Sequence, residues 1–117
     1  MKEIIAIIRP EQWNATKGKL TELGLPYTQC RVYGRGKQRG LKYLSRSKSG
    51  ALTQTGVRYV PKRCVILVVS DERVEATVQA LIQINQTGSI GDGKIFVSPL
   101  EEAVRIRTGE TGAVSLA

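Results

Sequence analysis

Residues 58–86 read RYVPKRCVILVVSDERVEATVQALIQINQ and join a strongly β-like run to a helical pattern. The run CVILVV at 64–69 is rich in β-branched residues and apolar on both faces, which predicts a buried strand over residues 58–70. Apolar side chains then recur at helical spacing, which predicts a helix over residues 71–86 with Asp71 as its N-cap. The apolar face of this helix would consist of Val74, Val78, Leu81, Ile82 and Ile84.

The rest of the chain supplies matching elements on both sides of this unit. Before it, the pattern predicts a strand over 2–9, a helix over 11–23 that ends at Gly24, and a strand over 27–33. Residues 34–57 show neither period, and their glycines and serines predict one long loop. After the unit we expect a glycine turn over 88–93, a strand over 94–98, a short turn over 100–103 and an extended piece over 104–108.

This order of elements predicts an α+β fold, the ferredoxin-like βαββαβ sandwich, with the long loop between its second and third strands. Two helices would cover one face of a four-stranded antiparallel sheet. The runs IIAII and CVILVV are apolar on both faces, so the uncovered face should also be buried. In a chain of 117 residues this predicts one domain, residues 1–117, that associates with copies of itself.

Composition excludes several classes of protein. With 41% hydrophobic and 24% charged residues, the chain lies in the globular range, and its apolar runs are too short to span a bilayer. The start MKEII lacks the features of a signal peptide. Cys30 and Cys64 lie in predicted strands and are expected as two buried, reduced thiols, which favours a cytoplasmic location. The chain has no histidine, which excludes histidine-dependent triads and Cys/His zinc sites and favours a role without catalysis.

The positive charge is concentrated in one segment. Ten basic and no acidic residues lie from Arg31 to Arg63, while the rest of the chain has eight bases and ten acids. A charged run is often only a solvated surface. Ten bases without a compensating acid instead favour an extended loop that binds an anion or an acidic protein surface.

Two shorter motifs also favour a polyanionic ligand. The turn TGSIGDGK, residues 87–94, lets successive backbone N–H groups approach an anion beside Lys94. It does not match a P-loop, because Ile95 stands where a Mg²⁺-binding Ser or Thr is needed and because the turn leads from a helix into a strand. Arg105 and Arg107 alternate on the expected extended piece, which would place both guanidiniums on one side as a phosphate fork. Together with the basic loop, these motifs predict a nucleotide as the ligand.

The same motifs resemble the signature of a known family. TGSIGDGKIFV at 87–97 and RIRTGE at 105–110 are similar to the PII family of nitrogen signal-transduction proteins. The start MKEIIAIIRPEQW, GRGKQRG at 34–40 and VPK at 60–62 also resemble it, so the likeness covers nearly the whole chain. It implies a homotrimer with a nucleotide site in each cleft between neighbouring subunits. In that family ATP and ADP compete, and 2-oxoglutarate binds through a Mg²⁺ ion held by ATP.

The resemblance also implies roles for individual residues. Residues 36–57 would form the T-loop that contacts target proteins, 87–94 the B-loop, and 104–112 the C-terminal loop. The implied nucleotide-binding residues are Thr28, Gly36, Lys37, Gln38, Gly91, Asp92, Gly93, Lys94, Arg105 and Arg107. The implied 2-oxoglutarate-binding residues are Arg9, Gln38, Gly40, Lys62 and Gly91, with Gln38 as the protein ligand to Mg²⁺.

The implied partner is a regulated target protein: an enzyme, a nitrogenase component or a membrane transporter, the last being the protein's only link to a membrane. YGRGKQRG and IFVSPLEEAVRIRTGE favour the nitrogenase-linked subgroup. The basic loop is longer than in the commonest bacterial members and lacks the tyrosine that receives uridylyl groups there. Two alternatives stay open. One is a PII-like regulator of inorganic-carbon uptake that binds adenine nucleotides and bicarbonate; the other is an RNA-binding ferredoxin-like module, which the scarcity of aromatic residues disfavours, so no nucleic acid is expected.

Overall fold

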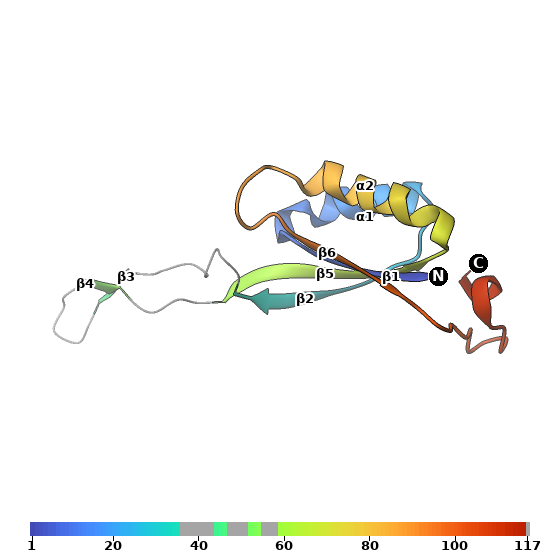
Figure 1. Ribbon diagram of the computed structural model, residues 1–117. Helices are drawn as coiled ribbons and strands as arrows, with labels where there is room; N and C mark the ends of the chain where they lie inside the picture. Colours follow the sequence, from blue (N-terminus) through green and yellow to red (C-terminus); the bar gives the residue numbers. More distant parts are fainter. Residues whose placement is uncertain (36–43, 47–51, 55–58, 117) are drawn as a thin grey trace.

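The computed structural model describes residues 1–35, 44–46, 52–54 and 59–116, and it consists of two layers, a sheet and a pair of helices (Figure 1). The sheet contains β1 (Lys2–Ile8), β2 (Thr28–Gly34), β5 (Val60–Val69) and β6 (Gly93–Pro99). The helices are α1 (Trp13–Glu22) and α2 (Val74–Asn85), and the 3-10 turns are η1 (Pro10–Gln12), η2 (Asp71–Arg73) and η3 (Gly112–Leu116). The predicted α+β fold, with a four-stranded antiparallel sheet and two helices, is confirmed.

The sheet has the strand order β2-β5-β1-β6, so the first strand of the chain lies inside the sheet and the second and last strands form its edges. All three strand pairs are antiparallel. Ile7 of β1 is the residue that pairs with both Cys64 of β5 and Lys94 of β6. Through this register, residues far apart in the sequence share one row across the sheet.

The core lies between the sheet and the two helices. Ile4, Ala6 and Ile8 of β1 alternate with less buried residues, as expected for a strand with one face in the core. These side chains pack in a single cluster with residues of the helices and of β5: Trp13, Leu20, Leu81, Val65, Leu67 and Val69. The opposite face of the sheet carries no helix in the described part of the chain, and on it Phe96 is 55% exposed.

The helix starts differ from the prediction at Asp71. Ser70 occupies the N-cap of η2, and no side chain caps that turn. The Asp71 carboxylate instead forms an ion pair with the amino terminus of Met1 at 3.0 Å. The antiparallel pairing of β1 with β5 brings the chain start to the end of β5, which no local pattern can reveal.

The cysteines also differ from the prediction in part. Both thiols are free, but only Cys64 is buried, whereas Cys30 is exposed on the edge strand β2. An edge strand has a sheet neighbour on one side only, so its side chains have fewer contacts.

Residues 104–108 do not form the predicted extended piece. Val104 and Thr111 form an isolated bridge, and the intervening residues turn back on themselves. The Arg105 N–H donates to the Glu110 carbonyl at 2.9 Å, and Gly109 closes the turn at φ +74°. The alternation of Arg105 and Arg107 therefore does not place them on one side of a strand.

The basic loop contains a small hairpin that the sequence pattern missed. β3 (Leu44–Arg46) and β4 (Leu52–Gln54) pair in a separate two-stranded antiparallel ladder. Figure 1 shows this ladder at one end of the molecule, away from the helices. The other residues of the predicted T-loop, 36–43, 47–51 and 55–57, lie outside the described residues. Among the described helices, none is long and apolar enough to cross a membrane.

Candidate functional site

The glycine-rich turn between α2 and β6 is organised around the carboxylate of Asp92. This carboxylate accepts hydrogen bonds from the Thr87 hydroxyl at 2.5 Å, the Thr87 N–H at 2.7 Å and the Gly88 N–H at 2.9 Å. These bonds favour the charged form, with the Thr87 hydroxyl contributing most, and they lower the pKa of Asp92 to about 2. Asp92 is thus an internal anion that holds the turn in shape.

Glycine is required at the start of β6. Gly93 has φ +113°, and a Cβ atom built there would lie 1.8 Å from the carbonyl oxygen of Ile7. Any side chain at this position would separate the ends of β1 and β6. The missing side chain is therefore what allows the turn to lie against the sheet.

Two cations from other parts of the chain converge on this turn. The Lys62 ammonium of β5 donates to the Gly91 carbonyl at 2.6 Å. The Arg9 guanidinium donates to the Ile90 carbonyl at 2.9 Å and lies 3.5 Å from the Asp92 carboxylate. Desolvation, followed by repulsion from Arg9, lowers the pKa of Lys62 below its ordinary value. An anion beside Lys62 would stabilise its charged form and so raise its pKa.

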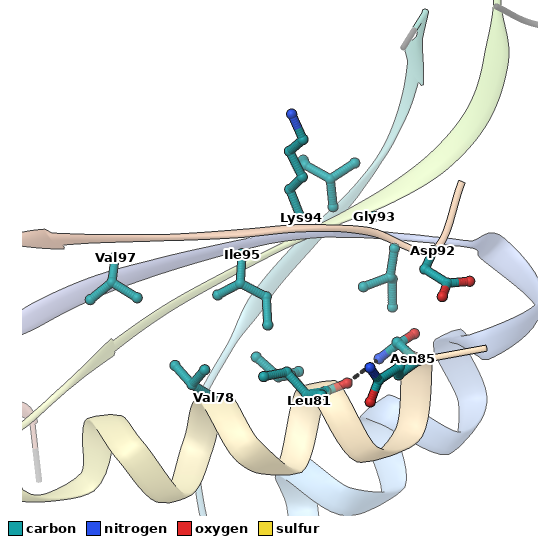
Figure 2. Close-up of a pocket in the computed structure, with 12 residues that line it drawn as sticks. Val78, Leu81, Asn85, Asp92, Gly93, Lys94, Ile95 and Val97 are labelled. Atoms are coloured by element: carbon teal, nitrogen blue, oxygen red, sulfur yellow. Dashed lines mark hydrogen bonds between the residues drawn. The ribbon is translucent and has the colours of Figure 1, made fainter. Parts of the chain in front are cut away.

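Two hollows flank β6, one on each face of the sheet. The first has a volume of about 340 Å³ and lies between β6 and α2. Figure 2 shows Val78 and Leu81 of α2 pointing toward Ile95 and Val97 of β6 across this hollow. Lys94 extends away from that space, to the opposite side of the strand (Figure 2). The first hollow is therefore a mostly apolar extension of the core.

The second hollow is the stronger candidate for a binding site. It has a volume of about 520 Å³. Among the described residues, its lining combines three cationic side chains with the backbone of the glycine turn and includes no carboxylate. The lining residues are Ile7, Gly34, Arg35, Val60, Lys62, Ser89, Ile90, Gly91, Gly93, Lys94 and Phe96. Cations and glycine backbone around a partly apolar floor suit a ligand that is anionic at one end.

The predicted site residues fall into four groups. Lys62, Gly91, Gly93 and Lys94 line the second hollow, with Arg9 and Asp92 bracing the turn beside it. Thr28 lies at the start of β2, on the opposite edge of the sheet from β6. Arg105 and Arg107 follow the far end of β6. The remaining residues lie outside the described part of the chain: Gly36, Lys37, Gln38 and Gly40.

The arginines of the C-terminal turn are distant from Lys94 along the chain's own path. β6 carries the backbone about 17 Å from Lys94 to Pro99 at the usual rise per residue. Figure 1 shows the glycine turn and the C-terminal turn at opposite ends of the helical layer. Within the C-terminal turn, the Arg105 guanidinium lies 3.3 Å from the Glu110 carboxylate and 3.3 Å from the Val114 carbonyl.

Sequence reasoning missed several residues that line the second hollow. Ile7 and Phe96 belong to the face of the sheet that carries Lys94, because Ile7 pairs with Lys94 and Phe96 is two residues further along β6. Period-two alternation on two predicted strands could have found them. Arg35 follows the end of β2 and could have been identified only once the strand order was known.

Comparison with known proteins identifies the family. The model of the family described as Nitrogen regulatory protein P-II matches residues 1–110. The chain therefore belongs to the P-II family of nitrogen regulatory signalling proteins. Members of this family typically act by binding target proteins.

Named relatives extend this likeness over nearly the whole chain. Nitrogen fixation nifHD region GlnB-like protein 2 of Methanobacterium ivanovii is 46% identical over 117 residues, which cover 96% of each chain. Nitrogen fixation nifHD1 region GlnB-like protein 2 of Methanosarcina barkeri is 42% identical over 122 residues, or 99% of each chain. Nitrogen regulatory protein P-II of Rhizobium meliloti is 45% identical over 113 residues, or 96% of each chain.

Proposed function

We propose that this protein is a cytoplasmic, non-enzymatic sensor that binds ATP or ADP in the second hollow and regulates target proteins of nitrogen metabolism. The observation that carries the proposal is the contact between Lys62 and the Gly91 carbonyl, because it brings a cation of β5 to the glycine turn that precedes Lys94. Two ammonium groups and the glycines Gly34, Gly91 and Gly93 then line one hollow. Polyphosphates bind to such arrangements.

The proposal places each complete nucleotide site between two copies of the chain. Lys94, Arg105 and Arg107 are all proposed to bind phosphates, and the length of β6 separates the first from the other two. A triphosphate is too short to span that separation, so the arginines of one copy would reach the hollow of its neighbour. Thr28, on the opposite edge strand, would contact the adenine in the same intermolecular cleft.

Self-association is supported by the uncovered face of the sheet. Ile5, Ile7 and Phe96 share that face through the register of β1 and β6, and Ile66 of β5 lies in the same row as Ile5. An apolar sheet face of this kind is stable when another surface covers it. A homotrimer, as in the PII resemblance, is the assembly we propose.

The second ligand is proposed to be 2-oxoglutarate. The Lys62 ammonium would pair with one of its carboxylates, and Arg9 would add a second positive charge at the same turn. Mg²⁺ would be held by the phosphates of ATP and by Gln38, which supplies an uncharged oxygen suited to this ion. The bound ligands would control the contact of residues 36–57 with the target protein. The nifHD-region relatives favour a target in nitrogen fixation.

Calorimetry with ATP and Mg²⁺, with and without 2-oxoglutarate, tests the proposal. Replacing Lys94 by Gln should weaken ATP binding at least about tenfold, since a charge-assisted phosphate contact contributes roughly 1.5–3 kcal/mol. Lys17→Gln is the matched control, because it removes the same charge from the exposed surface of α1. A similar loss in both variants would mean that only net charge matters.

The identity of the second ligand distinguishes the nitrogen-sensor role from regulation of inorganic-carbon uptake. Binding of 2-oxoglutarate only in the presence of ATP would support the nitrogen-sensor role. Binding of ATP without 2-oxoglutarate, but with bicarbonate, would replace that role by regulation of inorganic-carbon uptake. No binding of either adenine nucleotide would overturn the proposed function.

A further inference from the structure

The two cysteines of the chain face each other across the pair formed by β2 and β5. Cys30 and Cys64 are direct partners in the antiparallel register, and the chain has no other cysteine. Directly opposed residues on neighbouring strands have their side chains on the same face, with Cα atoms about 4.5–5.5 Å apart. Disulfides form across Cα separations of roughly 4.4–6.8 Å, so the backbone needs little or no adjustment to join these two.

The pair lies on the uncovered face of the sheet. Cys64 alternates with the core residue Val65 along β5, and it is absent from the core cluster that packs under the helices. Cys64 is nevertheless enclosed by its neighbours, whereas Cys30 on the edge strand is exposed. In the single chain one sulfur is therefore open to a reagent and the other lies behind it, and the reaction in the assembled protein requires that neighbouring copies leave this edge of the sheet uncovered.

The surroundings give the two thiols different reactivities. Desolvation raises the pKa of Cys64, and the adjacent Cys30 thiol raises that pKa further. Cys64 thus holds its proton, and the exposed Cys30 is the sulfur that a reagent meets first. This division is that of an attacking and a resolving cysteine.

We propose that Cys30 and Cys64 form a reversible redox pair that low-molecular-weight disulfides oxidise to an intrachain cross-strand disulfide. The pair is a modification site separate from the cations and the glycine turn of the second hollow. A disulfide at this position would affect the basic segment, because β2 and β5 are the strands that lead into and out of residues 35–59. Oxidation would fix the register of these two strands at the base of the basic segment.

The exchange proceeds in two balanced steps. The Cys30 thiol loses its proton to solvent, and its sulfur attacks a disulfide RSSR, which gives a Cys30–SR mixed disulfide and releases one RS⁻. The Cys64 thiol then loses its proton and attacks the Cys30 sulfur, which forms the Cys30–Cys64 bond and releases the second RS⁻. Two protein thiols are oxidised while one small disulfide is reduced to two thiols.

Glutathione disulfide is the probe for the test, applied to the folded, full-length protein at neutral pH. The expected product is a single chain with no bond to a second chain. Intact-mass analysis should show the loss of two hydrogen atoms, and no free thiol should remain. Proteolytic mapping should join the peptides that contain Cys30 and Cys64, and dithiothreitol should restore both thiols. Cys64→Ala should instead accumulate one stable glutathione adduct at Cys30, and Cys30→Ser should stay largely unmodified.

Three results would overturn the proposal. The first is a wild-type chain that keeps the glutathione adduct, because Cys64 would then fail to resolve it. The second is a disulfide that joins two copies of the chain. The third is a folded protein that does not react while the urea-unfolded chain does, which would mean that the pair is inaccessible in the assembled protein. Since the wild-type measurement alone decides among these outcomes, poor folding of either variant does not prevent the test.

Discussion

Replacing Gly93 by Ala should destabilise the protein more strongly than the same change at the glycines with positive φ that have open space around them: Gly24, Gly88, Gly109 and Gly112. At φ +113° an Ala side chain is strained, at a cost of roughly 1–3 kcal/mol. Its Cβ would also lie 1.8 Å from the Ile7 carbonyl oxygen, so β1 and β6 must separate at that point. Overpacking of this kind costs about 1–3 kcal/mol more.

The expected total loss is therefore about 2–6 kcal/mol, against a typical overall stability of roughly 5–15 kcal/mol. Urea unfolding followed by Trp13 fluorescence measures it, at one fixed protein concentration, since self-association would add to the apparent stability. Gly24→Ala is the matched control: Gly24 has φ +68°, and nothing lies within 4 Å of the added Cβ. The control isolates the cost of the backbone conformation, about 1–2 kcal/mol. Equal losses in the two variants would refute the inference that the close approach of β1 and β6 requires glycine at position 93.

Two predictions concern pH. Because the Thr87 hydroxyl and the N–H groups of Thr87 and Gly88 lower the pKa of Asp92 to about 2, the stabilising effect of this carboxylate should be complete above pH 3.8 and be lost as the pH falls through about 2. NMR shifts of the Thr87 and Gly88 amides should follow that titration, and a midpoint at the ordinary value would contradict it. Because desolvation and then Arg9 lower the pKa of Lys62, binding of 2-oxoglutarate with Mg²⁺–ATP should take up protons at alkaline pH and weaken as the pH rises through that lowered pKa. Calorimetry in two buffers of different ionisation enthalpy measures the uptake, and an unchanged uptake in Lys62→Met would assign it to another group.

Local patterns were sufficient to predict most of the sheet and both helices. β1 and β5 are strongly β-branched, and α2 shows a clear apolar face, so their boundaries could be predicted to within about three residues. The role of Asp71 could not be predicted in this way, because its actual partner, the amino terminus, is 70 residues away in the sequence. Long-range pairing there outweighed the local preference of an acidic residue for the N-cap.

The C-terminal turn shows a different limit. Val104, Arg105, Ile106 and Arg107 alternate as a strand would, yet within the described part of the chain their only strand-like pairing is the bridge from Val104 to Thr111. Isolated extended backbone leaves its polar groups unpaired, and the turn closed by Gly109 satisfies them locally. Alternation alone cannot reveal whether a partner strand exists.

The candidate site was predictable only in part. The glycine turn and Lys94 follow from residue types in one short segment, whereas the approach of Lys62 to Gly91 depends on the sheet register. The resemblance to the PII family implied roles for both lysine residues, and the register places both at one hollow. Roles for Gly36, Lys37, Gln38 and Gly40 stay predictions, because these residues lie outside the described part of the chain.

The separation of Lys94 from Arg105 and Arg107 has a genetic consequence if the site is shared between copies as proposed. A chain with a damaged C-terminal turn still offers an intact glycine turn to its neighbour, and a chain with a damaged glycine turn still offers intact arginines. Mixed assemblies of the two defective chains would then contain some complete sites, so co-expressed mutants could complement each other although neither works alone. Conversely, a copy damaged in both elements would impair the two clefts to which it contributes. A gene that encodes such a chain would therefore show both complementation between mutant alleles and dominance of some of them.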